Sequence, residues 1–183
     1  MAYNFINYID DNKKTISIVG ISLGILVIFS KKFLNLGLTS KSFFKMADSN
    51  SLVYPTKTQR DVSSFFGERT HPITRKSEFH NGIDIPALPK TPIYAPIDAK
   101  VVLNSYHDKG GNQLVISNGD IRLGFAHLYE KPKFKVGDKV KKGQKIALVG
   151  NTGLSTGSHL HFTLKIDNEW INPTKAFKEY ANV

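Results

Sequence analysis

From Val53 onward the sequence breaks into short runs of β-forming residues, and this pattern constrains the fold more than any other feature. The runs are separated by Gly, Pro, Asn and Asp, which favour turns. The candidate strands are residues 93–94, 99–105, 113–117, 122–127, 145–149 and 159–166. We therefore predict a mainly β domain built on an antiparallel β-sheet, with helix only near residues 174–179.

A second feature is an uncharged apolar run over residues 15–30, TISIVGISLGILVIFS, with a pair of lysines before it and another pair after it. A membrane-spanning helix needs about 20 residues, and flanking lysine side chains can extend their charges to the membrane interface. We predict four segments: an N-terminal tail over 1–12, a separate transmembrane helix over 13–35, a linker over 36–52 and a folded domain over 53–183.

Other interpretations of the apolar run stay open. A cleaved signal peptide shares the basic lead and apolar stretch, although Lys31 and Lys32 stand where small residues normally precede cleavage. A buried core helix is disfavoured because the run has no polar stripe. Orientation is also open: two lysines lie before the run and four after it, at 31, 32, 41 and 45. The positive-inside rule then leaves the C-terminal part on the cytoplasmic side.

The composition limits the chemistry. The chain has no cysteine, so a disulfide framework, a thiolate metal site and a cysteine nucleophile are excluded. A transition-metal site must therefore use histidine and carboxylate, which favours zinc. The net charge of +10 implies attraction to a polyanion or a solvated lysine surface. No signature of a nucleic-acid-binding module accompanies that charge.

Two histidines stand at strand spacing. His159 and His161 begin a run of β character, and side chains at i and i+2 of a strand point to the same face. Both imidazoles therefore face one site. His80 and Asp84 add a nitrogen donor and a carboxylate, and Asn81-Gly82 between them opposes a helix. We expect a turn entering a short strand, with His80 and Asp84 brought together by the bend.

Five blocks of the sequence resemble the LytM/lysostaphin-type peptidases, peptidase family M23. In order they are FGERTHPI (66–73), FHNGIDI (79–85), FAHL (125–128), VGDKVKKGQ (136–144) and GNTGLSTGSHLHF (150–162). The resemblance covers about residues 53–177 and does not extend to residues 1–50. One departure is Phe125, where tyrosine is common in the family. Its aromatic bulk is retained, so we expect its packing to survive.

The resemblance implies a function and a set of site residues. His80, Asp84 and His161 match the positions that bind one zinc ion (Zn²⁺), and His127 and His159 match the catalytic histidines. Two imidazoles and one carboxylate leave a fourth zinc position for water, which is typical of a catalytic site. We assign His159 as general base and His127 as oxyanion stabiliser, although the two roles could be exchanged.

The resemblance also implies the substrate. We expect a membrane-anchored endopeptidase that cuts peptide crosslinks of peptidoglycan, with the peptidase domain facing the cell wall. A catalytically silent wall-binding module of the same fold is the alternative, which the intact set of five residues disfavours. The enzyme could be cellular and remodel the wall, or be encoded by a bacteriophage and held in a virion membrane. His71 is expected to shape a groove or pack locally, and His107 to be exposed in a loop.

Overall fold

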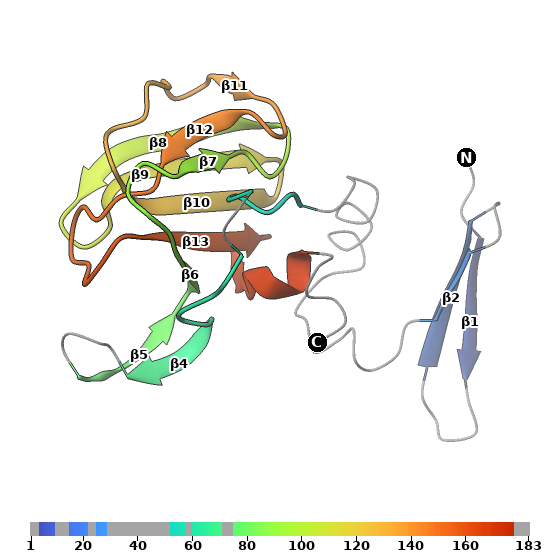
Figure 1. Cartoon of the computed structure of the whole chain (residues 1–183). Coiled ribbons are helices and arrows are strands. Elements are labelled where there is room, and N and C mark those ends of the chain that lie inside the picture. Colours follow the sequence, from blue (N-terminus) through green and yellow to red (C-terminus); the bar gives the residue numbers. More distant parts are fainter. Residues whose placement is uncertain are drawn as a thin grey trace. The chain divides into compact units, whose positions relative to one another are not determined.

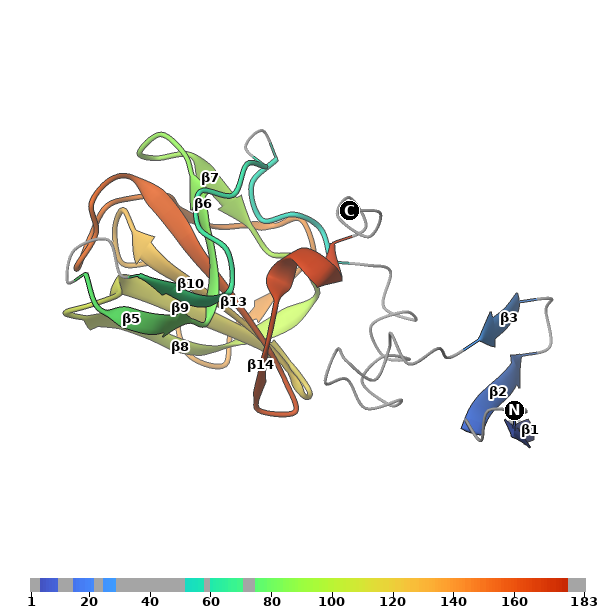
Figure 2. The same cartoon turned by 90° about the horizontal axis from the view of Figure 1, so that it is seen from below.

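The computed structural model describes residues 4–9, 15–21, 25–28, 52–57, 60–70 and 75–177. The chain divides into two compact units, Met1–Thr39 and Ser40–Val183. Figures 1 and 2 show the elements of the units from two directions.

The first unit differs from the sequence prediction. Its described parts form a small antiparallel sheet in the order β1-β2-β3, with bounds Asn4–Ile9, Thr15–Ile21 and Ile25–Ile28. The last two strands fall within the predicted transmembrane helix 13–35, whose other residues lie outside the described part of the chain. The run is rich in β-branched isoleucine, valine and threonine, which favour strands over helix. Among the described residues, no helix is long and apolar enough to span a membrane.

The second unit is built on a large antiparallel sheet. Its path is β11-β8-β9-β10-β13-β14, and β6 also pairs with β13. The bounds are Gly82–Pro86 (β6), Ala99–His107 (β8), Gly111–Asn118 (β9), Ile121–Leu128 (β10), Lys139–Val140 (β11), His159–Ile166 (β13) and Glu169–Ile171 (β14). Strand β13 is therefore interior: β10 lies along one side, and β6 and β14 share the other.

Two short strand pairs and a helical turn complete the unit. Pro92–Tyr94 (β7) pairs with Lys145–Leu148 (β12), and Gly67–Thr70 (β4) pairs with Ser77–His80 (β5). A 3₁₀ helix, η1, spans Pro173–Ala176, and Asn172 caps it by accepting a hydrogen bond from the backbone N–H of Thr174. Figure 1 shows β4 and β5 at the end of the unit where β6 leaves the large sheet.

The two faces of β13 have different neighbours. Alternate residues Leu160, Phe162, Leu164 and Ile166 are buried, whereas His159, His161, Thr163 and Lys165 are only partly buried. The buried set belongs to the apolar core, where the rings of Phe125 and Phe162 lie 5.4 Å apart between centroids. Because side chains alternate across a strand, one β13 face packs into the core and the other carries both histidines.

The prediction of a mainly β, antiparallel domain is confirmed. Six strands occur where they were expected, and the predicted run 159–166 has the same bounds in the structure. Strand β6 corresponds to the short strand that was expected after the turn at His80. Strands β4, β5, β11 and β14 were not predicted, because with two to four residues each they are too short for a period of two to stand out. The helical expectation near 174–179 corresponds to η1, and residues 178–179 lie outside the described part.

Candidate metal centre

The metal-ligand candidates meet because β6 and β13 pair antiparallel in one register. In that register His161 lies directly opposite Asp84, and Phe162 lies opposite Ile83. His80 ends β5, and Asn81 alone separates that strand from β6. The predicted bend is therefore present, and it joins two strands. It brings the His80 imidazole to the face of the sheet that carries His161.

The three side chains converge closely. The Asp84 Oδ1 atom lies 2.8 Å from His161 Nδ1 and 3.2 Å from His80 Nε2. The two ring nitrogens are 3.1 Å apart. One ligand atom from each residue falls within 4.8 Å of the other two, so the group could hold a metal ion. His80 is buried, whereas the side chains of Asp84 and His161 are 13% and 18% exposed. The cluster is therefore partly accessible to solvent.

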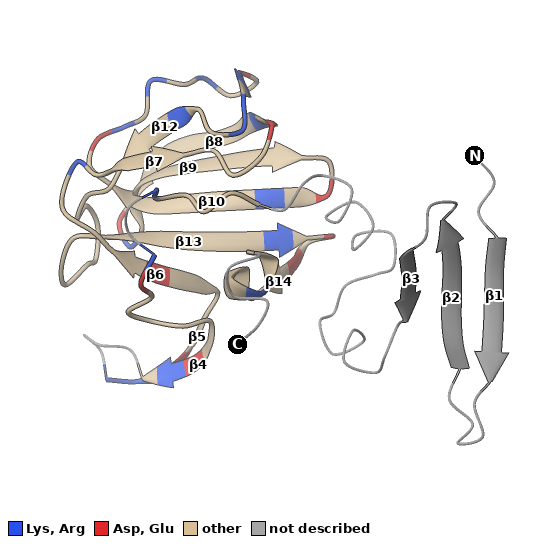
Figure 3. Cartoon of the chain, turned by 45° about the vertical axis from the view of Figure 1, so that its right-hand side comes forward, with Lys and Arg blue, Asp and Glu red and all other residues tan. Residues whose placement is uncertain are grey.

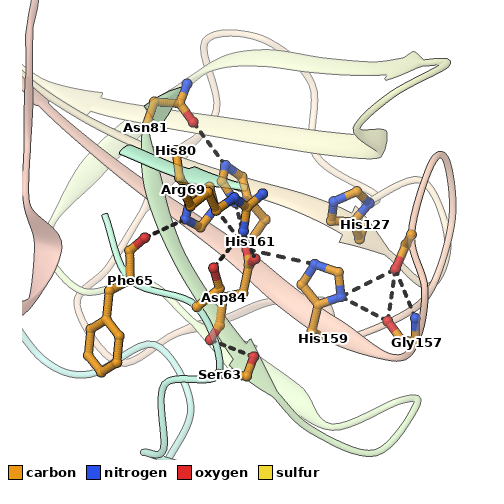
Figure 4. A network of polar contacts seen from close by, with 12 residues as sticks. Ser63, Phe65, Arg69, His80, Asn81, Asp84, His127, Gly157, His159 and His161 are labelled. Atoms are coloured by element: carbon orange, nitrogen blue, oxygen red, sulfur yellow. Dashed lines mark hydrogen bonds and ion pairs between the residues drawn. The ribbon is translucent and has the colours of Figure 1, made fainter. Parts of the chain in front are cut away.

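The hydrogen bonds on the outer side of each ring decide what this cluster can bind. His80 Nδ1 lies 2.8 Å from the carbonyl oxygen of Phe65, and His161 Nε2 lies 3.2 Å from Oδ1 of Asn81 (Figure 4). Both oxygens only accept, so each of these ring nitrogens must carry the proton. In the neutral rings the inward nitrogens are then lone pairs, facing the Asp84 carboxylate. Three acceptors so close together repel one another unless a cation lies between them, and a nitrogen–nitrogen–oxygen set suits zinc.

The surroundings of Asp84 and His161 favour the charged carboxylate and the neutral ring. Burial alone would raise the pKa of Asp84, but its close contacts with His161 and His80 outweigh burial and hold the pKa well below its usual range. Burial lowers the pKa of His161, although the contact with Asp84 acts in the opposite direction. At neutral pH the carboxylate is therefore charged and the His161 ring is neutral, as metal binding requires.

Two further histidines stand beside the cluster. The rings of His127 and His159 lie 4.6 Å apart between centroids, and the His127 ring lies 6.2 Å from that of His161. His159 reaches this place by strand alternation, two residues before His161. The His159 Nε2 atom is 3.8 Å from Oδ1 of Asp84, so all five predicted residues share one site.

His127 reaches the site through an irregularity in β10. Three residue steps from Phe125 to Leu128 are matched by only two steps on β9, from Leu114 to Asn112. This is a β-bulge, and His127 adopts a positive φ of 58° within it. Phe125 and Leu128 both stay in the core, while the ring between them turns toward His159. Regular alternation would have directed His127 into the core.

The loop between β12 and β13 orients both rings. The Nδ1 atom of His127 lies 2.8 Å from the carbonyl oxygen of Thr152, and that of His159 lies 2.8 Å from the carbonyl oxygen of Gly157. Each Nδ1 therefore donates its proton to the backbone. In the neutral rings each Nε2 is an unprotonated acceptor, available to take a proton. Burial lowers the pKa of His127, which favours its neutral form.

Several partners of the site were not predicted as such. Asn81 was expected only to set a turn, yet its amide also orients His161. The carbonyl oxygens of Phe65, Thr152 and Gly157 carry no side-chain signal that a sequence could display. Arg69 lies within one of the conspicuous blocks and contacts Asp84, but its role depends on the strand pairing.

The remaining predictions for individual residues have separate outcomes. His107 ends β8 and is exposed, as expected. Phe125 is 1% exposed and packs against Phe162, so its expected aromatic packing is confirmed. His71 lies outside the described residues.

Comparison with known proteins places this geometry in a family. The model of peptidase family M23 matches residues 78–173, a stretch that contains all five site residues. The chain belongs to peptidase family M23. The resemblance inferred from the motifs is confirmed.

Curated relatives match the M23 domain over part of their own length. Peptidoglycan DD-endopeptidase ShyA of Vibrio cholerae is 39% identical over 125 residues, which are 67% of this chain and 29% of ShyA. An uncharacterized metalloprotease of Haemophilus influenzae is 40% identical over 123 residues, or 66% of this chain and 26% of the relative. The match thus spans less than a third of either relative's length.

Solved structures share the M23 fold. A zinc-containing peptidase from Vibrio cholerae superimposes with a TM-score of 0.62 at 32% identity, covering 87% of this chain and 46% of that one. The catalytic domain of lysostaphin from Staphylococcus simulans gives a TM-score of 0.53 at 34% identity, covering 58% of this chain and 80% of that domain.

Proposed function

We propose that this chain is a zinc endopeptidase that hydrolyses peptide bonds in the crosslinks of peptidoglycan. The observation that carries the proposal is the convergence of three deprotonated ligand atoms, from His80, Asp84 and His161, beside two further histidines. The M23 relatives add support, because one is described as a peptidoglycan DD-endopeptidase and a similar structure as a zinc-containing peptidase.

The residues of the site can divide the work of amide hydrolysis. When bound to the three ligands, zinc supplies the Lewis acidity that promotes attack of water on an amide carbonyl. We assign His159 Nε2 to take the proton of the attacking water, because Nδ1 is held by the carbonyl oxygen of Gly157. His127 then stabilises the oxyanion, or donates a proton to the leaving amine, through Nε2.

The role assigned to His127 requires a particular protonation state of its ring. Its Nδ1 proton is committed to the Thr152 carbonyl, so Nε2 can donate only when the ring carries a second proton. Burial lowers the pKa of His127 and opposes that state before the reaction begins. Water attack releases one proton, which His159 takes, so His127 can protonate the leaving amine only after this proton has passed to its Nε2.

The charge of the domain suits an anionic wall polymer. Figure 3 marks Lys and Arg positions in blue on β12 and on the loops beside it. Lys139, Lys141, Lys142 and Lys145 are all exposed there. Positive charge of this kind raises the local concentration of a polyanion, in a salt-dependent manner.

Digestion of purified peptidoglycan tests the activity. We expect new amine ends and shortened crosslinked muropeptides by mass spectrometry, with both products lost after a zinc chelator and restored by zinc. The masses of the products identify which bond is cut. Binding to the wall without new amine ends, with or without chelator, would instead identify a silent wall-binding module.

We further propose that the N-terminal segment holds the chain at a membrane, with the peptidase domain facing the wall. The support is compositional: residues 15–30 carry no charge and lie between lysine pairs. We expect the full chain to stay with membranes after high-salt and alkaline washes, and a chain lacking residues 1–39 to be released. Release of both forms would contradict attachment. The same protein in purified virions would indicate a virus-encoded enzyme, and its restriction to uninfected bacterial membranes a cellular one.

A further inference from the structure

Arg69 links the β4–β5 pair to the Asp84 carboxylate. Its Nη1 atom donates to Asp84 Oδ2 at 3.0 Å (Figure 4). The same nitrogen donates to Ser64 Oγ at 2.6 Å. The other carboxylate oxygen, Oδ1, is the one that faces His80 and His161. The two oxygens of Asp84 are thus divided between the arginine and the metal cluster.

The guanidinium is itself held in place. Arg69 lies opposite Glu78 in the β4–β5 register, and its Nε and Nη2 donate to Glu78 Oε1 at 3.0 and 2.9 Å. Arg69 is 23% exposed and Asp84 13%, so water competes only partly for these hydrogen bonds. A planar guanidinium fixed along one edge presents its remaining N–H groups in a defined direction, which a lysine could not do.

The backbone of Asp84 is fixed by the same region of the chain. Its N–H donates to the carbonyl oxygen of Ser64 at 2.9 Å, and its own carbonyl accepts from the N–H of Ser63 at 2.9 Å. These bonds locate the Cα atom and leave the carboxyl group free to rotate. Arg69 contacts Oδ2 of this carboxyl group directly.

We propose that Arg69 is a positioning residue of the metal centre, holding Oδ2 of Asp84 so that Oδ1 is presented to the ion. This inference rests on the proposed zinc function. Partners that orient a metal-ligating side chain commonly change metal affinity by about 10- to 100-fold when they are removed.

Electrostatics alone predicts the opposite effect. Removing the positive charge of Arg69 leaves the carboxylates of Glu78 and Asp84 near the ion, and this would tighten the binding of a cation. Positioning instead predicts weaker binding, because Asp84 must be ordered when the metal arrives. The sign of the change in the zinc dissociation constant therefore distinguishes the two roles.

The test measures zinc affinity of the full chain by competition with a chromophoric chelator. We expect Arg69→Met to raise the zinc dissociation constant by about 10- to 100-fold, and Arg69→Lys to recover only part of the loss. The double variant R69M/E78Q, which removes both charges of the pair, is expected to stay weak. Arg122→Met, at an exposed position of β10, is the matched control and should bind zinc as the unaltered chain does.

Two readouts separate positioning from a general loss of stability. A merely structural role would lower the melting temperature equally with and without zinc. If Arg69 positions Asp84, zinc raises the melting temperature of Arg69→Met by less than it raises that of the unaltered chain. The visible absorption spectrum of the cobalt-substituted variant should also differ. If Arg69→Met does not fold, Arg69→Lys and Glu78→Gln provide the same comparison.

The outcomes are distinguishable. Unchanged or tighter zinc binding in Arg69→Met, with one zinc still bound by the unaltered chain, would overturn the positioning role and leave the proposed function intact. An unaltered chain that binds no zinc would overturn both.

Discussion

Replacing Asp84 by alanine is expected to abolish zinc retention and to reduce wall hydrolysis to the background rate. Asp84 supplies the single negative charge among the three ligands, and its Oδ1 lies within 3.2 Å of a ligand nitrogen on both His80 and His161. Without the carboxylate two neutral imidazoles remain, and the positive charge of the ion is no longer offset. We expect zinc affinity to fall by more than about 100-fold, beyond the usual cost of losing an orienting partner.

Measurement of bound zinc and of released amine ends checks this prediction. Asp108→Ala is the matched control, because Asp108 is an exposed aspartate in the turn between β8 and β9. It should retain both zinc and activity. The circular dichroism of each variant establishes that the β domain is still folded. An Asp84→Ala protein that keeps one zinc and full activity would remove Asp84 from the metal centre.

Alanine at His159, or at His127, is expected to separate catalysis from metal binding. Neither ring belongs to the three-ligand cluster, so zinc should remain bound at unchanged stoichiometry. Loss of a positioned acid or base costs about 10²- to 10⁴-fold in rate, and we expect kcat to fall by that range. The two ring centroids lie 4.6 Å apart, and the two imidazoles would take part in one proton-transfer sequence. The fold-loss in kcat of the double variant should therefore be smaller than the product of the two single fold-losses.

The kinetics of these variants also test the division of roles. If His159 is the base, added imidazole should partly restore the rate of His159→Ala and should not restore that of His127→Ala. The reverse pattern would exchange the two roles. His107→Ala is the control: its side chain is exposed at the end of β8, and kcat should be unchanged. Loss of zinc from either single variant would show that the ring holds the metal.

The sequence predicted which residues form the site better than it predicted how the strands bring them together. His159 and His161 could be placed on one face from strand spacing alone, because a period of two admits only that outcome in a regular strand. The register that sets Asp84 opposite His161 joins residues 77 positions apart, and no local pattern specifies it. The family resemblance supplied what spacing could not: that His80, Asp84 and His127 join the same site.

For the apolar N-terminal run, the sequence did not predict the secondary structure. Its composition suggested a helix over 13–35, but the described residues within it form strands β2 and β3. Hydrophobicity predicts burial without choosing the secondary structure, and an isoleucine-rich run is compatible with either. Strands β4 and β5 were missed for another reason. Their alternation extends over only four residues each, and what they contribute is the Arg69–Glu78 contact between them.

The bulge in β10 limits what can be concluded from an intact set of site residues. One extra residue between Phe125 and Leu128 reverses the parity of the strand, so that His127 faces the histidines and both neighbours of the bulge remain in the core. A homologue that kept all five residues and this spacing, but in which residues 125–128 alternated regularly, would direct the imidazole into the apolar interior. The bulge is therefore as informative as the histidine itself when active members of the family are distinguished from silent ones.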